Sequence, residues 1–135
     1  MEDQAESIQK RLAGFFPESL GVRVTSAQPD RVTAELDVRD DLCTVPGICH
    51  GGALMAFADT LGAVGTVLNL PPGAGTTTIE SKTNFFAPGL AGTTLKAECV
   101  PINRGRRTQT WQTTIRNPEG KLLALITQTQ FVLEQ

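Results

Sequence analysis

The chain has 135 residues, of which 40% are hydrophobic, and this is enough for one domain with a usable core. Its net charge of -2 and pI near 5.3 give no general attraction to nucleic acid or anionic membranes, and no apolar run is long enough to span a bilayer. The polar N-terminus is unlike a signal peptide, and the three cysteines are an odd number at irregular spacing, so we expect a cytoplasmic protein with reduced cysteines. With one histidine and no CxxC pair, no metal site is expected.

The first predicted element is a short amphipathic helix over about residues 3–16, in which apolar side chains recur at helical spacing. The next two segments, residues 20–28 and 31–40, alternate apolar and polar side chains. Because a Pro-Asp pair separates them, we expect two paired strands joined by a turn.

A long apolar helix is the central predicted element. The turn-rich segment before it, "DLCTVPGICHGG", is predicted to be a loop. The helix is expected from about Gly51 to Leu68, where "PPGAG" ends it. Because it is apolar on all of its faces, we expect it to be buried on all of them.

The second half of the chain is predicted to be almost entirely β-strand, over residues 76–86, 93–102, 108–116 and 122–133. A type I turn with Pro118 and Glu119 at its centre is expected between the last two strands. The order of elements predicts an α+β fold in which an antiparallel sheet wraps around the long helix. Such a sheet has a back face and open edges, so we expect two subunits, or two dimers, to cover them.

One carboxylate, Asp59, lies within the most apolar segment of the chain. From Gly51 to Ile79 there is no other Asp, Glu, Lys or Arg, and the residues three and four positions from Asp59 offer it no partner. Burying an unpaired carboxylate costs on the order of several kcal/mol, so its partners must come from another element, another subunit or water. The acid therefore either faces solvent at a subunit interface or serves a function.

The start of the same helix is a second candidate feature. A helix N-terminus presents unpaired backbone N–H groups, and Gly51 and Gly52 allow another molecule to approach them closely. This arrangement suits a carbonyl oxygen that becomes an oxyanion. Close packing of the helix against a strand is the alternative, and His50 stands where it could simply bond locally as the N-cap.

A third feature is the cluster Arg104, Arg106 and Arg107 at a strand turn of an otherwise acidic chain. It is either a solvated turn or a clamp for a ligand that carries phosphate.

The segment "GICHGGALMAFAD", from Gly47 to Asp59, resembles the signature of hotdog-fold acyl-CoA thioesterases. The similarity is to the PaaI-type branch of the 4-hydroxybenzoyl-CoA thioesterase superfamily. That signature is Asn-x-x-Gly-x-x-His-Gly-Gly, followed by an apolar helix that carries an Asp or Glu. The later segments "TIESKTNFFAPG" and "NRGRRTQTWQTTIRNPEGKLLA" resemble the same family. The resemblance covers roughly residues 18–133 and implies a hotdog fold, in which a long helix lies inside a curved antiparallel sheet.

The resemblance also implies an enzyme that hydrolyses acyl-CoA without a cofactor, with Asp59 as general base or nucleophile. Gly51 would supply the backbone N–H that polarises the thioester carbonyl, and His50 would support that end of the site. A hydroxyl of the next strand, Thr78 or in another register Thr77, would orient water or the acid. In this family the helix start of one subunit faces the acid of its partner, so a homo-oligomer, a dimer or a homotetramer built from two dimers, is expected.

The chain departs from the family pattern at Thr44, which replaces the Asn three residues before Gly47. Threonine is shorter and lacks an amide donor, so a second hypothesis is a hotdog module that binds acyl-CoA without hydrolysing it. A third is a hotdog dehydratase or hydratase, which needs a catalytic histidine and which the position of His50 at the helix start disfavours. The sequence leaves the acyl group open among aryl, short, medium and long chains.

Overall fold

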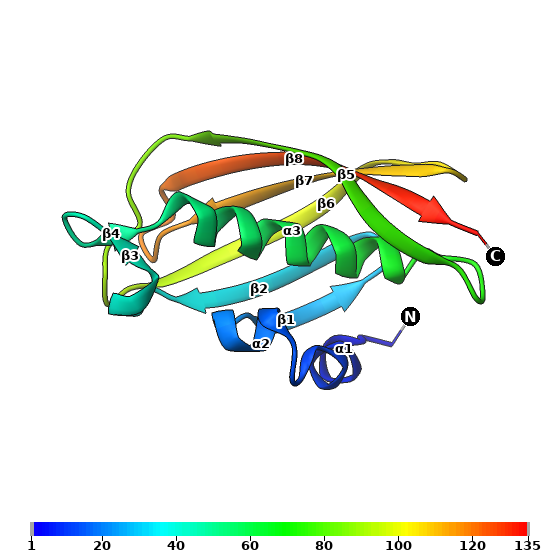
Figure 1. Ribbon diagram of the computed structural model, residues 1–135, viewed down its shortest axis with the longest axis horizontal. Helices are drawn as coiled ribbons and strands as arrows, with labels where there is room; N and C mark the ends of the chain where they lie inside the picture. Colours follow the sequence, from blue (N-terminus) through cyan, green and yellow to red (C-terminus); the bar gives the residue numbers. More distant parts are fainter. Residues whose placement is uncertain (1, 135) are drawn as a thin grey trace.

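The computed structural model describes residues 2–134, in which one curved sheet wraps around one long helix (Figure 1). The helices are α1 (Ala5–Leu12), α2 (Phe16–Leu20) and α3 (Gly51–Val67). The strands of the large sheet are β1 (Arg23–Gln28), β2 (Arg31–Asp37), β5 (Gly75–Phe85), β6 (Thr94–Arg104), β7 (Thr108–Arg116) and β8 (Leu122–Leu133). Strand β2 ends at Asp37, three residues before the end predicted for it, and a 3-10 turn (Asp40–Leu42) follows. The two-residue strands β3 (Cys43–Thr44) and β4 (Ile48–Cys49) lie in the segment predicted to be a loop.

The six strands pair antiparallel in the order β1-β2-β6-β7-β8-β5. The α+β arrangement predicted from the sequence is therefore confirmed. The turn predicted between β7 and β8 is also confirmed, since the Gly120 N–H donates to the Asn117 carbonyl at 2.9 Å. None of the helices within residues 2–134 is long and apolar enough to cross a membrane.

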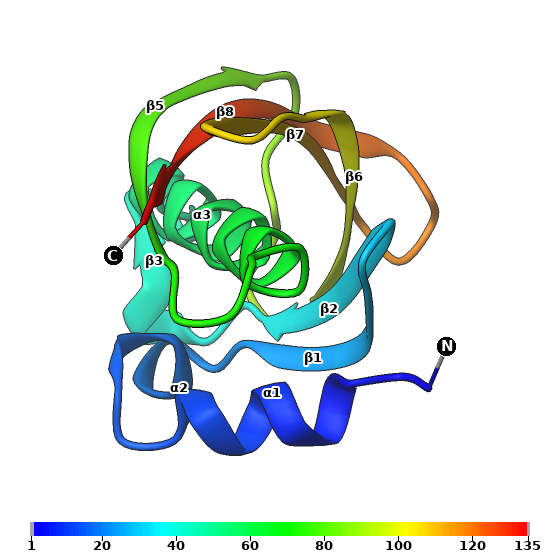
Figure 2. The ribbon, with the colours of Figure 1, turned by 90° about the vertical axis from the view of Figure 1, so that its right-hand side faces the viewer.

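The long helix α3 lies in the concave side of the sheet, as the view along its axis shows (Figure 2). Its side chains Leu54, Phe57 and Leu61 are buried in the core. Two glycines let the helix approach the sheet closely: a Cβ atom at Gly62 would overlap the Gln128 amide, and one at Gly65 would lie 2.8 Å from the Trp111 ring. The packing of α3 on β7 and β8 therefore fixes which way its polar residues point.

One face of α3 is not covered, which corrects the expectation that the helix is buried on every side. Met55 is 38% exposed. The half-buried side chains of this face are Ala56, Asp59, Ala63 and Val67. The sheet encloses the opposite faces, and α1 and α2 cover only part of this one (Figure 2).

The N-terminal region also differs from the prediction of one helix over residues 3–16, because it forms two helices. The break falls at Gly14, whose φ of 85° lies in the left-handed region that favours glycine. Pro17 then stands in the first turn of α2, where a missing N–H costs nothing. Helix α1 is fastened to β1 by Gln9, whose side chain bonds the backbone of Val22 and Val24.

Strand β5 is an edge strand of 11 residues, and within residues 2–134 it pairs on one side only, with β8. Two apolar side chains of this strand are exposed, Ile79 by 58% and Phe85 by 51%. A long apolar edge of this kind is a template for pairing with another chain. The edge of β5 and the uncovered face of α3 are thus two open surfaces on which another chain can pack.

Candidate active site

Asp59 lies in the middle of α3 and finds its partner on β5. The Thr78 hydroxyl donates a hydrogen bond to Asp59 Oδ1 at 2.7 Å, and the acid is half-buried. Its other oxygen, Oδ2, has no hydrogen-bond partner within residues 2–134. Thr77 is exposed, because successive side chains of a strand point to opposite faces. The partner expected from another element is therefore Thr78 and not Thr77.

A second layer of hydrogen bonds fixes the Thr78 hydroxyl. Gln130 Nε2 donates to Thr78 Oγ1 at 2.7 Å, and Thr76 Oγ1 donates to Gln130 Oε1 at 3.0 Å. The Gln130 side chain is fully buried, at 0% exposure. Because Thr78 Oγ1 accepts from Gln130, its one proton is directed to Asp59.

Sequence reasoning missed Gln130. The available signal was a pair of glutamines, Gln128 and Gln130, at alternate positions of the last strand, which places both on its inward face. Buried amides need partners, so such a pair points to a polar network inside the sheet.

At the start of α3, His50 is the N-cap residue, and its Nδ1 accepts the Gly52 N–H at 2.7 Å. The Gly52 donor is therefore used inside the chain. The Gly51 N–H, in contrast, has no acceptor within residues 2–134. A Cβ atom at Gly51 would lie 3.1 Å from the Phe85 ring, so the glycine relieves a close approach of β5 to the helix start.

The structure does not bring the Gly51 N–H and the Asp59 carboxylate of one chain together. Both residues belong to α3. Eight helical steps separate them, which is about 12 Å along the axis.

Thr44 lies apart from Asp59, in the β3–β4 hairpin. It is exposed, and its carbonyl accepts the Gly47 N–H at 2.7 Å. Its side chain borders a shallow depression formed by the hairpin with Asp40 and Ala91, and this depression does not include Asp59.

The three arginines of the predicted clamp are all exposed. Arg104 donates to the Pro29 carbonyl at 3.2 Å, and Arg106 lies 3.9 Å from the Glu134 carboxylate. The Arg107 guanidinium has no hydrogen bond or ion pair within residues 2–134. Arg107 is therefore the member of the cluster whose guanidinium has neither kind of partner within residues 2–134.

This turn between β6 and β7 lies beside the C-terminal end of α3. The Pro29 carbonyl accepts a hydrogen bond from Arg104 and another from Asn69. Asn69 lies two residues after Val67, the last residue of α3. The arginines and the Gly51 N–H of one chain therefore lie at opposite ends of α3.

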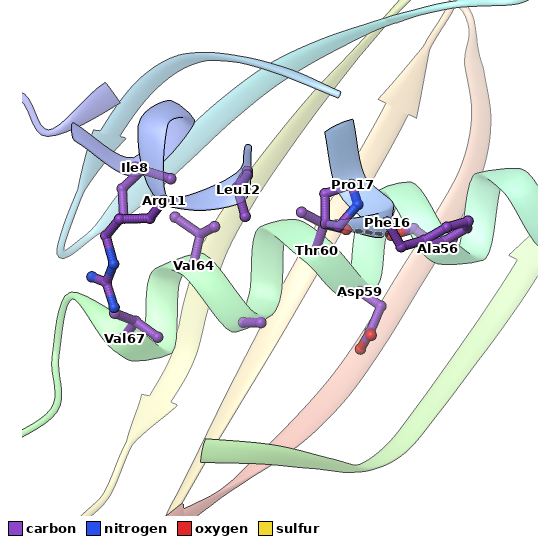
Figure 3. A pocket seen from close by; sticks show the side chains of 11 residues that line it. Ile8, Arg11, Leu12, Phe16, Pro17, Ala56, Asp59, Thr60, Val64 and Val67 are labelled. Atoms are coloured by element: carbon purple, nitrogen blue, oxygen red, sulfur yellow. Dashed lines mark hydrogen bonds between the residues drawn. The ribbon is translucent and has the colours of Figure 1, made fainter. Parts of the chain in front are cut away.

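An elongated cavity of about 420 Å³ follows the uncovered face of α3 (Figure 3). Its walls come from α1, α2 and α3, and the residues are Ile8, Arg11, Leu12, Phe16, Pro17, Ala56, Asp59, Thr60, Ala63, Val64 and Val67. The volume is within the range of small-molecule sites, which are mostly apolar with a few placed polar groups. Asp59 stands at the rim of this cavity (Figure 3).

The cysteine next to the helix start does not suit nucleophilic catalysis. Burial raises the pKa of the Cys49 thiol to about 11, and the neighbouring Cys43 adds to the shift. The thiol is therefore protonated at neutral pH, whereas the thiolate is the nucleophile. Within the described part of the chain, no group of three or more His, Cys, Asp or Glu side chains is placed to hold a metal ion.

Comparison with known proteins gives one consistent family. The model of the family described as "Thioesterase superfamily" matches residues 46–124. The 1,4-dihydroxy-2-naphthoyl-CoA hydrolase of Listeria monocytogenes is 27% identical over 109 residues, which are 80% of this chain and 87% of that protein. A thioesterase structure from Haemophilus influenzae has 28% identity and a TM-score of 0.90, covering 96% of this chain and 90% of its own. A variant of the phenylacetic acid degradation protein PaaI from Thermus thermophilus has 34% identity and a TM-score of 0.79, covering 86% and 96%.

Proposed function

This chain belongs to the thioesterase superfamily and is a thioester hydrolase, and from that premise we propose that it hydrolyses acyl-CoA thioesters to free acid and CoA. The hotdog fold and the PaaI-type resemblance are confirmed by the same comparisons. The observation that carries the proposal is the Thr78–Asp59 hydrogen bond, which holds one oriented carboxylate at the rim of an apolar cavity.

The chemistry needs an activated attack on the thioester carbonyl carbon. Asp59 Oδ1 is held by Thr78, so Oδ2 is the oxygen that either takes a proton from the attacking water or attacks the carbon itself. The C–S bond then breaks and CoA leaves as a thiolate. If Asp59 took the proton of the attacking water, the free acid is released directly. If Asp59 attacked the carbon itself, water hydrolyses the acyl–Asp59 anhydride in a second step, which releases the free acid and restores the carboxylate. Because a thiolate is a good leaving group, the chain needs no acid to protonate it and no cofactor.

The oxyanion that forms during attack needs a donor, and we assign it to a Gly51 N–H. A general base acts within about 3 Å of the group it serves, or through one water. About 12 Å of helix separates Gly51 from Asp59 in one chain, so the donor at each site belongs to another subunit. Two α3 helices that lie antiparallel across a two-fold axis would bring each helix start to the middle of the other. The open edge of β5 and the uncovered face of α3 support a dimer of this kind, or a pair of such dimers.

A hydrolysis screen with aryl-, short-chain and long-chain acyl-CoA esters tests this function, by following release of free CoA. We expect turnover of at least one class. Tight binding without turnover would instead favour an acyl-CoA-binding module, for which Thr44 at the family's Asn position is the motive.

We expect Gln130→Met to lower kcat by about threefold to tenfold with little change in KM, because one neutral hydrogen bond that orients Thr78 is lost. Methionine has a similar length and suits a buried position. Steady-state kinetics on the best ester of the screen measures the effect. Gln109→Met is the matched control, since Gln109 lies beside Gln130 on β7, is buried and does not bond Thr78 or Asp59. Equal losses in both variants would show that the effect is general core damage.

The arginine turn is expected to bind the phosphates of CoA. Arg107→Glu should raise KM for acyl-CoA by about threefold to tenfold and change kcat less, because that contact is made equally in the ground state and the transition state. Arg104→Glu and Arg106→Glu complete the series, and Arg116→Glu at the other end of β7 is the control. If KM is unchanged in all three variants of the turn, the arginines are solvated surface.

A further inference from the structure

We propose that the cavity along α3 receives the acyl group and that Arg11 selects acyl chains whose far end carries a carboxylate. The inference rests on the proposed function, because the position of Asp59 decides where the thioester carbonyl lies. It adds a substrate class and a residue that determines specificity.

The walls of the cavity suit a hydrocarbon chain. Helices α1 and α2 provide Ile8, Leu12, Phe16 and Pro17, and they turn an open face of α3 into a cavity. The α3 side contributes the small or branched side chains Ala56, Ala63, Val64 and Val67. Burial of methylene groups against such walls is favourable by about 0.8 kcal/mol for each group.

The two charged residues of the lining lie far apart along this cavity. In the view of Figure 3, Asp59 lies toward the end of the cavity that Ala56 and Phe16 line, and Arg11 lies toward the end that Val67 lines. Eight helical steps from Asp59 to Val67 correspond to about 12 Å along α3. An acyl chain with its carbonyl at Asp59 therefore has to be of medium length to place its far end at Arg11.

The charge of Arg11 is not balanced inside the chain. Arg11 is exposed, and its guanidinium makes no hydrogen bond or ion pair within residues 2–134. Its neighbour Lys10, in contrast, pairs with Glu6 at 3.5 Å. A cation in the last turn of α1 interacts favourably with the helix dipole, and Lys10 is placed to make the same interaction. What distinguishes Arg11 is its position in the cavity wall, where a guanidinium can bind a carboxylate through two parallel hydrogen bonds.

The test compares octanoyl-CoA with suberyl-CoA, which has the same chain length and a terminal carboxylate. The measured quantity is the ratio of kcat/KM for suberyl-CoA to that for octanoyl-CoA. We expect Arg11→Gln to lower this ratio by about threefold to fivefold, the value of a partly exposed ion pair. Lys10→Gln removes the same charge from the same turn of α1, and it should leave the ratio as in the parent chain. Added salt should lower the ratio in the parent chain.

An equal ratio in the parent chain and Arg11→Gln would overturn the proposal, and so would an equal fall in Lys10→Gln, which would reflect net charge alone. If octanoyl-CoA is hydrolysed and the ratio does not respond, only the specificity inference fails. If the parent chain hydrolyses neither of these two esters but turns over another acyl-CoA of the screen, only the specificity inference fails. If it hydrolyses no acyl-CoA of the screen, the proposed function fails, and calorimetric binding of octanoyl-CoA and suberyl-CoA to the parent chain and to Arg11→Gln tests the role of Arg11. In that case, tighter binding of suberyl-CoA than of octanoyl-CoA that is lost in Arg11→Gln supports recognition of the terminal carboxylate by Arg11. Equal affinities of the parent chain for the two esters refute it.

Discussion

Asp59→Asn is expected to fold as the parent chain does and to lose about a hundredfold or more of kcat, because a general base contributes on that scale. Asparagine has the same shape, and its Oδ1 still accepts the Thr78 hydroxyl, so α3 and β5 should stay joined. What is lost is the negative oxygen, which takes the proton of water or attacks the thioester. Steady-state hydrolysis of the best acyl-CoA ester measures the loss, with circular dichroism and thermal unfolding to verify the fold.

The control for this variant is Asp30→Asn, which changes an exposed acid in the turn between β1 and β2. It should retain the parental kcat. If Asp59→Asn also turns over at nearly the parental rate, Asp59 has no role in the chemical step and the proposed mechanism is wrong.

A Gly51→Pro chain and an Asp59→Asn chain, each inactive alone, are expected to restore activity when they form mixed dimers. Proline removes the Gly51 N–H, and loss of one oxyanion donor costs about a hundredfold to a thousandfold in kcat. The backbone tolerates the change: proline is favoured at the first position of a helix, and the preceding His50 has φ -60° and ψ 136°, an extended conformation. A mixed dimer contains one site with both defects and one site with neither. Random mixing should therefore recover about a quarter of the parental activity.

Gly51→Ala is the matched control for the proline variant. It adds the same Cβ atom beside the Phe85 ring and keeps the N–H, so it should lose less activity than Gly51→Pro. Mixed dimers are isolated with two different affinity tags, one on each chain. If dimers purified in this way stay inactive, the donor and the acid do not meet across a subunit interface.

Local patterns in the sequence predicted most of the fold. Alternating side chains located the strands of the sheet, and the long apolar segment located α3, because these periods are set by the backbone of each element alone. The isolation of Asp59 among apolar residues marked it as a residue that needs a partner elsewhere. The "GICHGGALMAFAD" segment added the family, which the comparisons confirm.

The partners of these residues were decided only by the tertiary structure. Thr78 is 19 residues from Asp59 in the chain, and Gln130 is 52 residues from Thr78. Which strand residue faces the helix depends on register, since a shift of one residue turns every side chain to the other side of the sheet. This is why the sequence left Thr77 and Thr78 as alternatives and gave no role to Gln130.

Sequence patterns also could not predict the cavity or the uncovered face of α3. Apolar side chains around the whole helix predicted burial on all faces, but the curved sheet encloses only some of them. The break at Gly14 then lets α1 and α2 cover part of the remaining face, and this leaves a lined cavity with Arg11 and Asp59 far apart along it. The sequence by itself determined which segments are apolar and which elements they form. The tertiary structure decided which apolar surface stays open, because that depends on how elements distant in the chain fit around one another.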